Sequence, residues 1–275
     1  MPRITTPARP AALLAGAIAM AAPGAAQDFD TQPSIREMES RLEDQHVLFG
    51  VEIESDVTDD LLELGRLVAM GGAEAGGSGM ACVSCHGAEG RGDGSGAFPR
   101  IAGQPGWYLY KQLTDYASGA RPNRVMSGIA QRLTETEMEA VSAYYAAIDA
   151  PFRPVLGTVD AQTLQWGGQL GAAGSAELGI PACVNCHGAQ GTGNPPSVPY
   201  LAGQYANYMT HQLQLWKDGT RDNDAMNVMS AIASKMTEED MRAVSEYYAR
   251  VRPPEREDLS GTARTTAAEG AAGGD

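Results

Sequence analysis

Two short clusters of cysteine and histidine carry the most specific chemistry in the sequence. Cys-x-x-Cys-His is the attachment signature of c-type haem, in which two thiols one helical turn apart add to the two vinyl groups of one porphyrin. The histidine beside them then lies under the iron as the proximal ligand. The spacing predicts two covalently bound haem c groups, one for each cluster. The residues of the two clusters are Cys82, Cys85 and His86, and Cys183, Cys186 and His187.

Other interpretations of the four cysteines fit the sequence less well. Disulfides are the usual expectation for an exported chain, but a bridge within a Cys-x-x-Cys pair has poor geometry and leaves the repetition unexplained. A zinc site would have to unite the two clusters and would give the histidines no role. A thioredoxin-like motif needs a βαβ setting, and strand patterns are nearly absent.

The chain contains the same unit twice. Residues 98–104 match residues 198–204, and Met126–Ala130, read Met-Ser-Gly-Ile-Ala, match Met229–Ala233, read Met-Ser-Ala-Ile-Ala. The offset between matched positions varies from 100 to 103, so loops have changed length while the elements stayed. A repeat of this length suits a duplicated domain rather than a solenoid unit.

The apolar periodicity predicts an all-α fold. Residues 59–70 have helical spacing behind Thr58 as N-cap. A second helix is expected over 106–117 and 205–216. A capping-box spacing at Thr134 opens the last helix of the first unit, and a variant of it with Asp opens that of the second at Thr237. Four glycines of the first helices are expected either to allow close helix crossing or to form caps and turns: Gly65, Gly71, Gly168 and Gly174.

These patterns divide the chain into six segments. They are a signal peptide over 1–26, an acidic extension over 27–58, a first haem domain over 59–150, a linker over 151–161, a second haem domain over 162–252, and a disordered tail over 253–275.

Met126 and Met229 are the predicted distal iron ligands. Each lies about 40 residues after its proximal histidine, in a loop before a capped helix, and both share the Met-Ser-small-Ile-Ala context. A lone methionine usually fills gaps in a core, but the repeated context favours these two. Met226 is the rival in the second unit, whereas His46 and His211 have no matched histidine and are expected at the surface.

Matched prolines and several arginines are expected to support the haems. Pro99 and Pro199 offer a carbonyl that would hold the outer nitrogen of the proximal histidine. Propionates need cationic partners, for which the sequence offers Arg100, Arg121 and Arg221.

The composition agrees with haem-filled domains and excludes some partners. Aromatic residues are only 6% of the chain, so a porphyrin would supply much of each core. The formal charge of −14 disfavours nonspecific binding to nucleic acid or anionic lipid.

The first 26 residues predict export to the periplasm. Arg3 and Arg9 precede the apolar stretch 11–22 and a small-residue cleavage site at 24–26. The weaker alternative is an uncleaved anchor. No later segment is apolar enough to span a membrane, so the chain is not expected to be an integral membrane protein. Peripheral association with a membrane is compatible with the sequence. Cleavage would remove two arginines and no acids, leaving a charge of −16.

With both clusters, the Pro-x-Ile/Leu-Ala-Gly-Gln loops and the Met-Ser-x-Ile-Ala segments in place, residues 60–252 resemble the dihaem cytochrome c4 family. The resemblance implies two tandem class I cytochrome c domains, each wrapped around one haem c with histidine and methionine ligands. It also implies an electron carrier, not an enzyme. Members of that family resemble periplasmic electron donors to terminal oxidases.

The expected function is therefore electron transfer between redox proteins. The donor would be a dehydrogenase or a quinol-oxidising complex, and the recipient a terminal oxidase or another acceptor. Two alternatives stay open: a cytochrome subunit of a periplasmic dehydrogenase complex, and a dihaem peroxidase-type enzyme with one open iron. Residues 27–60, with eleven acids and two bases, and the tail depart from the compact family pattern and leave the partner undefined.

Overall fold

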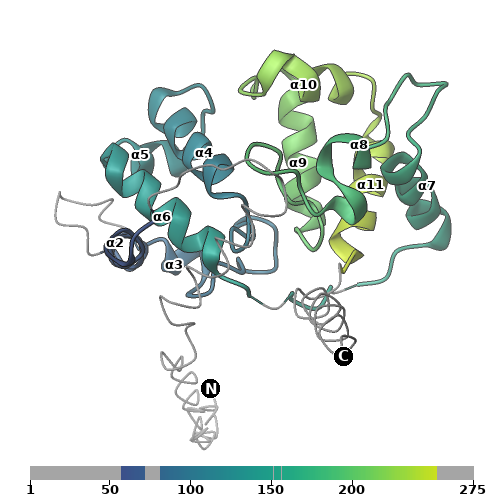
Figure 1. Cartoon of the computed structure of the whole chain (residues 1–275). Helices are drawn as coiled ribbons and strands as arrows, with labels where there is room; N and C mark the ends of the chain where they lie inside the picture. Colours follow the sequence, from purple (N-terminus) through teal and green to yellow (C-terminus); the bar gives the residue numbers. More distant parts are fainter. Residues whose placement is uncertain (1–56, 72–80, 151, 156, 253–275) are drawn as a thin grey trace, which may run out of the picture. The chain divides into compact units, whose positions relative to one another are not determined.

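The computed structural model describes residues 57–71, 81–150, 152–155 and 157–252, and in this part the chain is helical (Figure 1). The first repeat contains α2 (Asp59–Ala69), α3 (Val83–His86), α4 (Gly106–Ser118), α5 (Met126–Ala130) and α6 (Glu135–Ala147). The second contains α7 (Ala161–Ala172), α8 (Val184–His187), η2 (Ala189–Gly191), α9 (Ala206–Lys217), η3 (Ala225–Asn227), α10 (Val228–Ala233) and α11 (Glu238–Arg250). Between these helices, the β-type pairings of the described residues are two isolated bridges, so the predicted all-α class is confirmed.

The predicted signal peptide, most of the acidic extension and the tail lie outside the described residues. The predicted domain boundaries stay predictions, and α7 begins one residue before the expected start of the second domain. None of the described helices combines the length and apolar character needed to cross a bilayer.

Side-chain caps fix where the long helices begin. The hydroxyl of Thr58 accepts a hydrogen bond from the N–H of Leu61 at 3.2 Å at the start of α2. Thr134 with Glu137 and Thr237 with Asp240 form complete capping boxes on α6 and α11. Each box satisfies backbone N–H groups that the first helical turn leaves without partners. The sequence-predicted starts of these helices are therefore confirmed.

In each repeat the first helix crosses the last helix at very short range. A Cβ atom added to Gly65 of α2 would lie 2.1 Å from the carbonyl oxygen of Ala140 in α6. Gly167 of α7 meets the carbonyl oxygen of Ala243 in α11 at the same 2.1 Å. Only glycine permits this approach, because any side chain would overlap the facing backbone.

The crossing therefore confirms the expectation for Gly65 and corrects it for the second repeat, where Gly167 rather than Gly168 lies at the contact. Gly71 and Gly174 have φ of +83° and +73°, a left-handed conformation that suits a turn. They serve the alternative role that the sequence allowed, the turn that follows the first helix.

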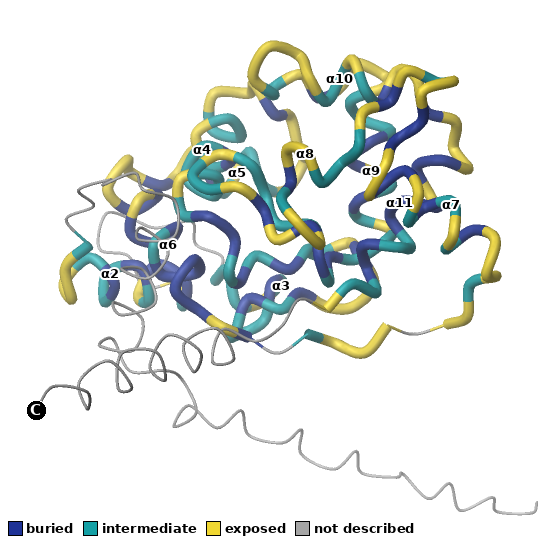
Figure 2. Tube along the Cα trace, turned by 45° about the vertical axis from the view of Figure 1, so that its right-hand side comes forward, coloured by how far each residue is buried: buried dark blue, intermediate teal, exposed yellow. Residues whose placement is uncertain are grey.

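Each repeat builds its own hydrophobic core, which can be followed as dark blue segments in Figure 2. In the first core Leu62 and Val68 of α2 pack with Val141 and Tyr144 of α6. The second core has Leu170 of α7 with members of α9, α10 and α11, including Leu213, Ala233 and Met241. Cys82 packs against the first core and Cys183 against the second, so each cluster belongs to a separate core.

Candidate functional site

Each Cys-x-x-Cys-His cluster forms a single helical turn. In α3 the carbonyl oxygen of Cys82 accepts hydrogen bonds from the N–H groups of Cys85 at 3.2 Å and His86 at 2.9 Å. The carbonyl of Cys183 accepts from Cys186 and His187 at the same two distances. The two cysteines therefore lie one helical turn apart, with the histidine directly after the second, which is the spacing that haem attachment requires.

No disulfide joins Cys82, Cys85, Cys183 and Cys186, and the first cysteine of each pair lies against the preceding helix. The Sγ of Cys82 lies 3.9 Å from the carbonyl oxygen of Val68, and that of Cys183 lies 3.5 Å from the carbonyl of Leu170. Burial raises the pKa of each of these two thiols to about 11.

A proline carbonyl orients each cluster histidine. The Nδ1 of His86 lies 2.9 Å from the carbonyl oxygen of Pro99, and the Nδ1 of His187 lies 2.9 Å from that of Pro199. Burial lowers the pKa of both imidazoles, while the bond to the carbonyl opposes this shift. A neutral ring that donates from Nδ1 leaves Nε2 free to bind a metal. The predicted role of the two prolines is confirmed.

Met126 lies at the start of a short helix, not in the loop that the sequence suggested. The side-chain oxygen of Asn123 accepts hydrogen bonds from the N–H groups of Val125 and Met126, both at 2.9 Å, and so caps α5. In the second repeat Asp224 takes this task and accepts from the N–H of Met229 at 2.6 Å. These bonds fix the backbone of each methionine at the start of its short helix, which limits the positions that its sulfur atom can occupy.

Met226 lies in a three-residue insertion that the second repeat has and the first repeat lacks. It has φ of +57°, and Asn227 has φ of +55°, so the inserted residues form a left-handed turn before α10. The Met226 side chain is 90% exposed. The rival distal ligand thus points to the surface, whereas Met229 is half-buried.

One continuous cavity of about 520 Å³ reaches all eight of the predicted haem residues. Apolar side chains of both repeats contribute most of its wall, among them Ile101, Leu113, Leu201, Leu213 and Ile232. A largely apolar cavity bordered by two thiol pairs, two imidazoles and two thioethers fits two porphyrins with histidine and methionine ligands. The cluster residues and distal methionines that line it are Cys82, Cys85, His86, Met126, Cys183, Cys186, His187 and Met229.

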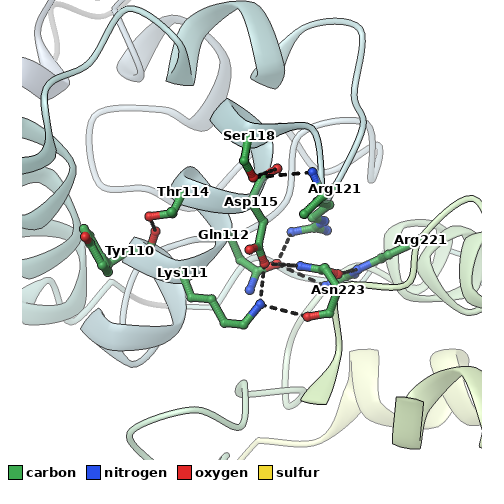
Figure 3. Close-up of polar contacts among 10 residues, drawn as sticks. Tyr110, Lys111, Gln112, Thr114, Asp115, Ser118, Arg121, Arg221 and Asn223 are labelled. Carbon is green, nitrogen blue, oxygen red and sulfur yellow. Dashed lines mark hydrogen bonds and ion pairs between the residues drawn. The ribbon is translucent and has the colours of Figure 1, made fainter. Parts of the chain in front are cut away.

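Two buried arginines face the cavity, and no carboxylate of the described residues pairs with them. Arg121 and Arg221 are each 4% exposed. They bond instead to the side-chain oxygens of Gln112 and Gln212 at 2.6–3.2 Å, in the network drawn in part in Figure 3. Burial, together with the like charge of Arg121, lowers the pKa of Arg221. An anion is the missing partner of such a pair, and haem propionates would supply it.

The other candidate partners of the haem groups have different surroundings. The guanidinium of Arg100 donates to the carbonyl of Ala150 at 2.5 Å and stacks over Phe152 at 4.6 Å. His211 is exposed at the rim of the cavity, as predicted, and His46 lies outside the described residues.

Residues that the sequence did not single out also contribute polar atoms to the cavity wall. The Oγ atoms of Ser142 and Ser245 and the indole nitrogen of Trp216 are buried, and no hydrogen-bond partner for them lies among the described residues. Such groups are costly unless a bound molecule satisfies them. The two serines occupy matched positions of the repeats, and that pairing was the signal available in the sequence.

Residues 78–147 and 172–251 each match the cytochrome c family. The chain belongs to the cytochrome c family. This cytochrome is 42% identical over 186 residues to the thiosulfate dehydrogenase electron acceptor of Stutzerimonas stutzeri, an alignment that covers 68% of the chain and 85% of that relative.

Two solved structures extend the comparison. A thiosulfate dehydrogenase from Marichromatium purpuratum superposes with a TM-score of 0.62 at 38% identity, covering 71% of this cytochrome and 43% of that chain. Reduced cytochrome c4 from Pseudomonas stutzeri superposes with a TM-score of 0.59 at 30% identity. That alignment covers 70% of this cytochrome and 98% of the solved chain. The predicted family, fold and cofactors are therefore confirmed. This is a dihaem electron-transfer cytochrome with two covalently bound haem c groups, and it acts as a carrier, not as an enzyme.

Proposed function

We propose that this cytochrome is exported to the periplasm and there accepts electrons from a thiosulfate-oxidising dehydrogenase. The observation that carries the proposal is one cavity lined by two complete sets of haem residues, in a chain that aligns with 85% of a thiosulfate dehydrogenase electron acceptor. The identity to that acceptor is 42%, against 33–35% to three curated cytochromes c4. Electrons would then pass to a terminal oxidase or another acceptor.

Within this proposal, the residues divide into two equivalent haem sites. Each site has two cysteines for the thioether bonds, a proximal histidine and a distal methionine. The first is made by Cys82, Cys85, His86 and Met126, and the second by Cys183, Cys186, His187 and Met229. The support is that these side chains line the cavity in matched positions and that both histidines already donate from Nδ1.

The surrounding residues perform the remaining tasks. Arg121 and Arg221 would compensate the propionates, because their buried charges have no carboxylate partner among the described residues. The apolar walls exclude water, which limits solvent reorganisation when charge changes. Pro99 and Pro199 hold the imidazole planes. When bound, each haem supplies a one-electron ferric–ferrous couple.

The number of haems would suit a donor that couples two thiosulfate anions. Joining two thiosulfate anions through a new sulfur–sulfur bond releases two electrons and no protons. Two haems can hold two electrons, so one chain could accept both electrons that one coupling releases. Met126 and Met229 would each close the distal position of one iron, which disfavours the alternative of a peroxidase-type enzyme.

Stopped-flow reduction of the purified oxidised cytochrome tests the proposal. With thiosulfate and catalytic amounts of a thiosulfate dehydrogenase, we expect two electrons per chain to enter. Thiosulfate alone is the control and should reduce neither haem. Fast reduction by a quinol-oxidising complex, together with none by the dehydrogenase, would replace this proposal with a cytochrome c4-type carrier.

A further inference from the structure

Two glutamines at equivalent positions each bond to the backbone of the other repeat. The Oε1 of Gln204 accepts from the N–H of Arg100 at 3.0 Å, and its Nε2 donates to the Arg100 carbonyl at 2.8 Å. Gln104 makes the same two bonds to Tyr200, at 2.9 and 2.8 Å. Both glutamines are 5% exposed, so these bonds form where water competes little.

The bond from Gln204 connects directly to a cluster histidine. The N–H of Arg100 and the carbonyl of Pro99 belong to one peptide group. That carbonyl lies 2.9 Å from Nδ1 of His86, and the N–H of the same peptide donates to Gln204. One amide therefore links the imidazole of the first repeat to a side chain of the second.

The second repeat contains the same connection in the opposite direction. The Pro199 carbonyl lies 2.9 Å from Nδ1 of His187, and the N–H of that peptide, which is the N–H of Tyr200, donates to Gln104. Because the two chains of bonds cross between the repeats, neither repeat completes the surroundings of its own histidine.

Hydrogen bonds that share one amide strengthen each other. When the N–H donates, electron density moves toward the carbonyl oxygen, and that oxygen becomes a better acceptor. A better acceptor for Nδ1–H makes the imidazole more basic and a stronger donor to the iron. Ferric iron gains more from this than ferrous iron, so the reduction potential falls.

We propose that Gln204 is a positioning residue for the His86 haem and Gln104 for the His187 haem, so that each repeat sets the potential of the haem in the other. The proposal rests on the histidine ligation given under the proposed function. Glutamine suits this role because its amide both accepts from the N–H and donates to the next carbonyl, which fixes its orientation.

Two leucine variants test the crossing. In Gln204→Leu, we expect the reduction equilibrium of the His86 haem to shift roughly threefold toward the ferrous form. That shift is about 28 mV upward, at 59 mV per tenfold for a one-electron couple. The His187 haem should keep its potential. Gln104→Leu should raise the potential of the His187 haem and leave that of the His86 haem unchanged. Redox titrations followed by NMR measure the two haems separately.

A second readout reports the hydrogen bond itself. The chain has only four histidines, so ¹⁵N-histidine labelling gives few ring signals in the reduced protein. In Gln204→Leu, the Nδ1–H proton of His86 should move upfield because its bond to the carbonyl weakens, while that of His187 stays. Gln204→Glu keeps an acceptor oxygen, and it should leave the potential of the His86 haem equal to or below that of the parent.

Tyr205→Phe is the matched control. It removes another bond between the repeats, from the Tyr205 hydroxyl to the carbonyl of Arg91 at 2.5 Å, and leaves both peptides intact. Both potentials should remain those of the parent. Shifts at both haems in Gln204→Leu, at neither, or only at the His187 haem would overturn the proposal. A wrong histidine assignment would show earlier, because the parent His86 ring would lack the shifts of a haem-bound imidazole.

Discussion

Replacing Gly167 by alanine should destabilise the second repeat far more than the same change one residue later. A Cβ at Gly167 would lie 2.1 Å from the carbonyl oxygen of Ala243 and 2.9 Å from the Cβ of Tyr247. Comfortable contacts between carbon atoms begin near 3.5 Å, so α7 would have to move away from α11 by roughly 1 Å. At Gly168 the nearest atom is a ring carbon of Tyr247 at 3.3 Å, and a side-chain ring can yield.

These distances set the expected free energies of unfolding. Overpacking costs about 1–3 kcal/mol, and the backbone overlap at Gly167 places it at the upper end. Removing a glycine from a helix interior returns about 1 kcal/mol. We therefore expect a net loss of about 2 kcal/mol for Gly167→Ala. Gly168→Ala should fall between no change and a gain of about 1 kcal/mol, because it keeps the helix benefit with little overlap.

Thermal unfolding of the oxidised haem protein, followed by circular dichroism, measures the difference. A loss of about 2 kcal/mol should lower the Tm of a domain of this size by at least about 8 °C. Gly65→Ala is the equivalent test in the first repeat, where the facing atom is the carbonyl oxygen of Ala140 at 2.1 Å. Equal Tm values for Gly167→Ala and Gly168→Ala would refute the assignment of the crossing residue.

Further expectations concern the haems and the partner. The intact mass of the exported protein should exceed that of the polypeptide by two haem groups, and acid acetone should not extract them; an extractable haem would contradict the two attachments. Met126→Ala and Met229→Ala should each open one iron to carbon monoxide and lower that haem's potential, whereas loss of methionine ligation in Met226→Ala would show the register to be wrong. Because eleven acids lie in 27–60, electron transfer to a cationic partner should slow with salt, and less so without residues 27–57. A flat salt response in both forms would assign those acids to solubility.

Features encoded locally could be predicted from the sequence. A cluster such as Cys82-x-x-Cys85-His86 needs only one turn of helix, and a capping box such as Thr134 with Glu137 acts within four residues. The prediction for Pro99 also succeeded, because its matched partner Pro199 narrowed the choice of carbonyl.

Features that depend on how helices or repeats pack against each other could not be predicted from the sequence in this way. Gly167 and Gly168 are neighbours in sequence, and only the rotation of α7 about its axis decides which one faces α11. The repeat showed that Gln104 and Gln204 are equivalent, but equivalence within each copy does not reveal a contact with the opposite copy. The helical start at Met126 was missed because its cap, Asn123, lies three residues upstream with no periodic apolar pattern between them.

The contacts between the repeats have the form of an isologous interface. Arg121 bonds to Gln212 while Arg221 bonds to Gln112, so each surface presents the same groups to the other, as in a two-fold homodimer. In such a dimer any substitution appears twice, and the two haem surroundings must remain identical. Joining the copies in one chain removes that restriction: Tyr116 stands where the other repeat has Trp216. The duplicated chain can therefore make its two redox centres unequal and give electron flow a direction.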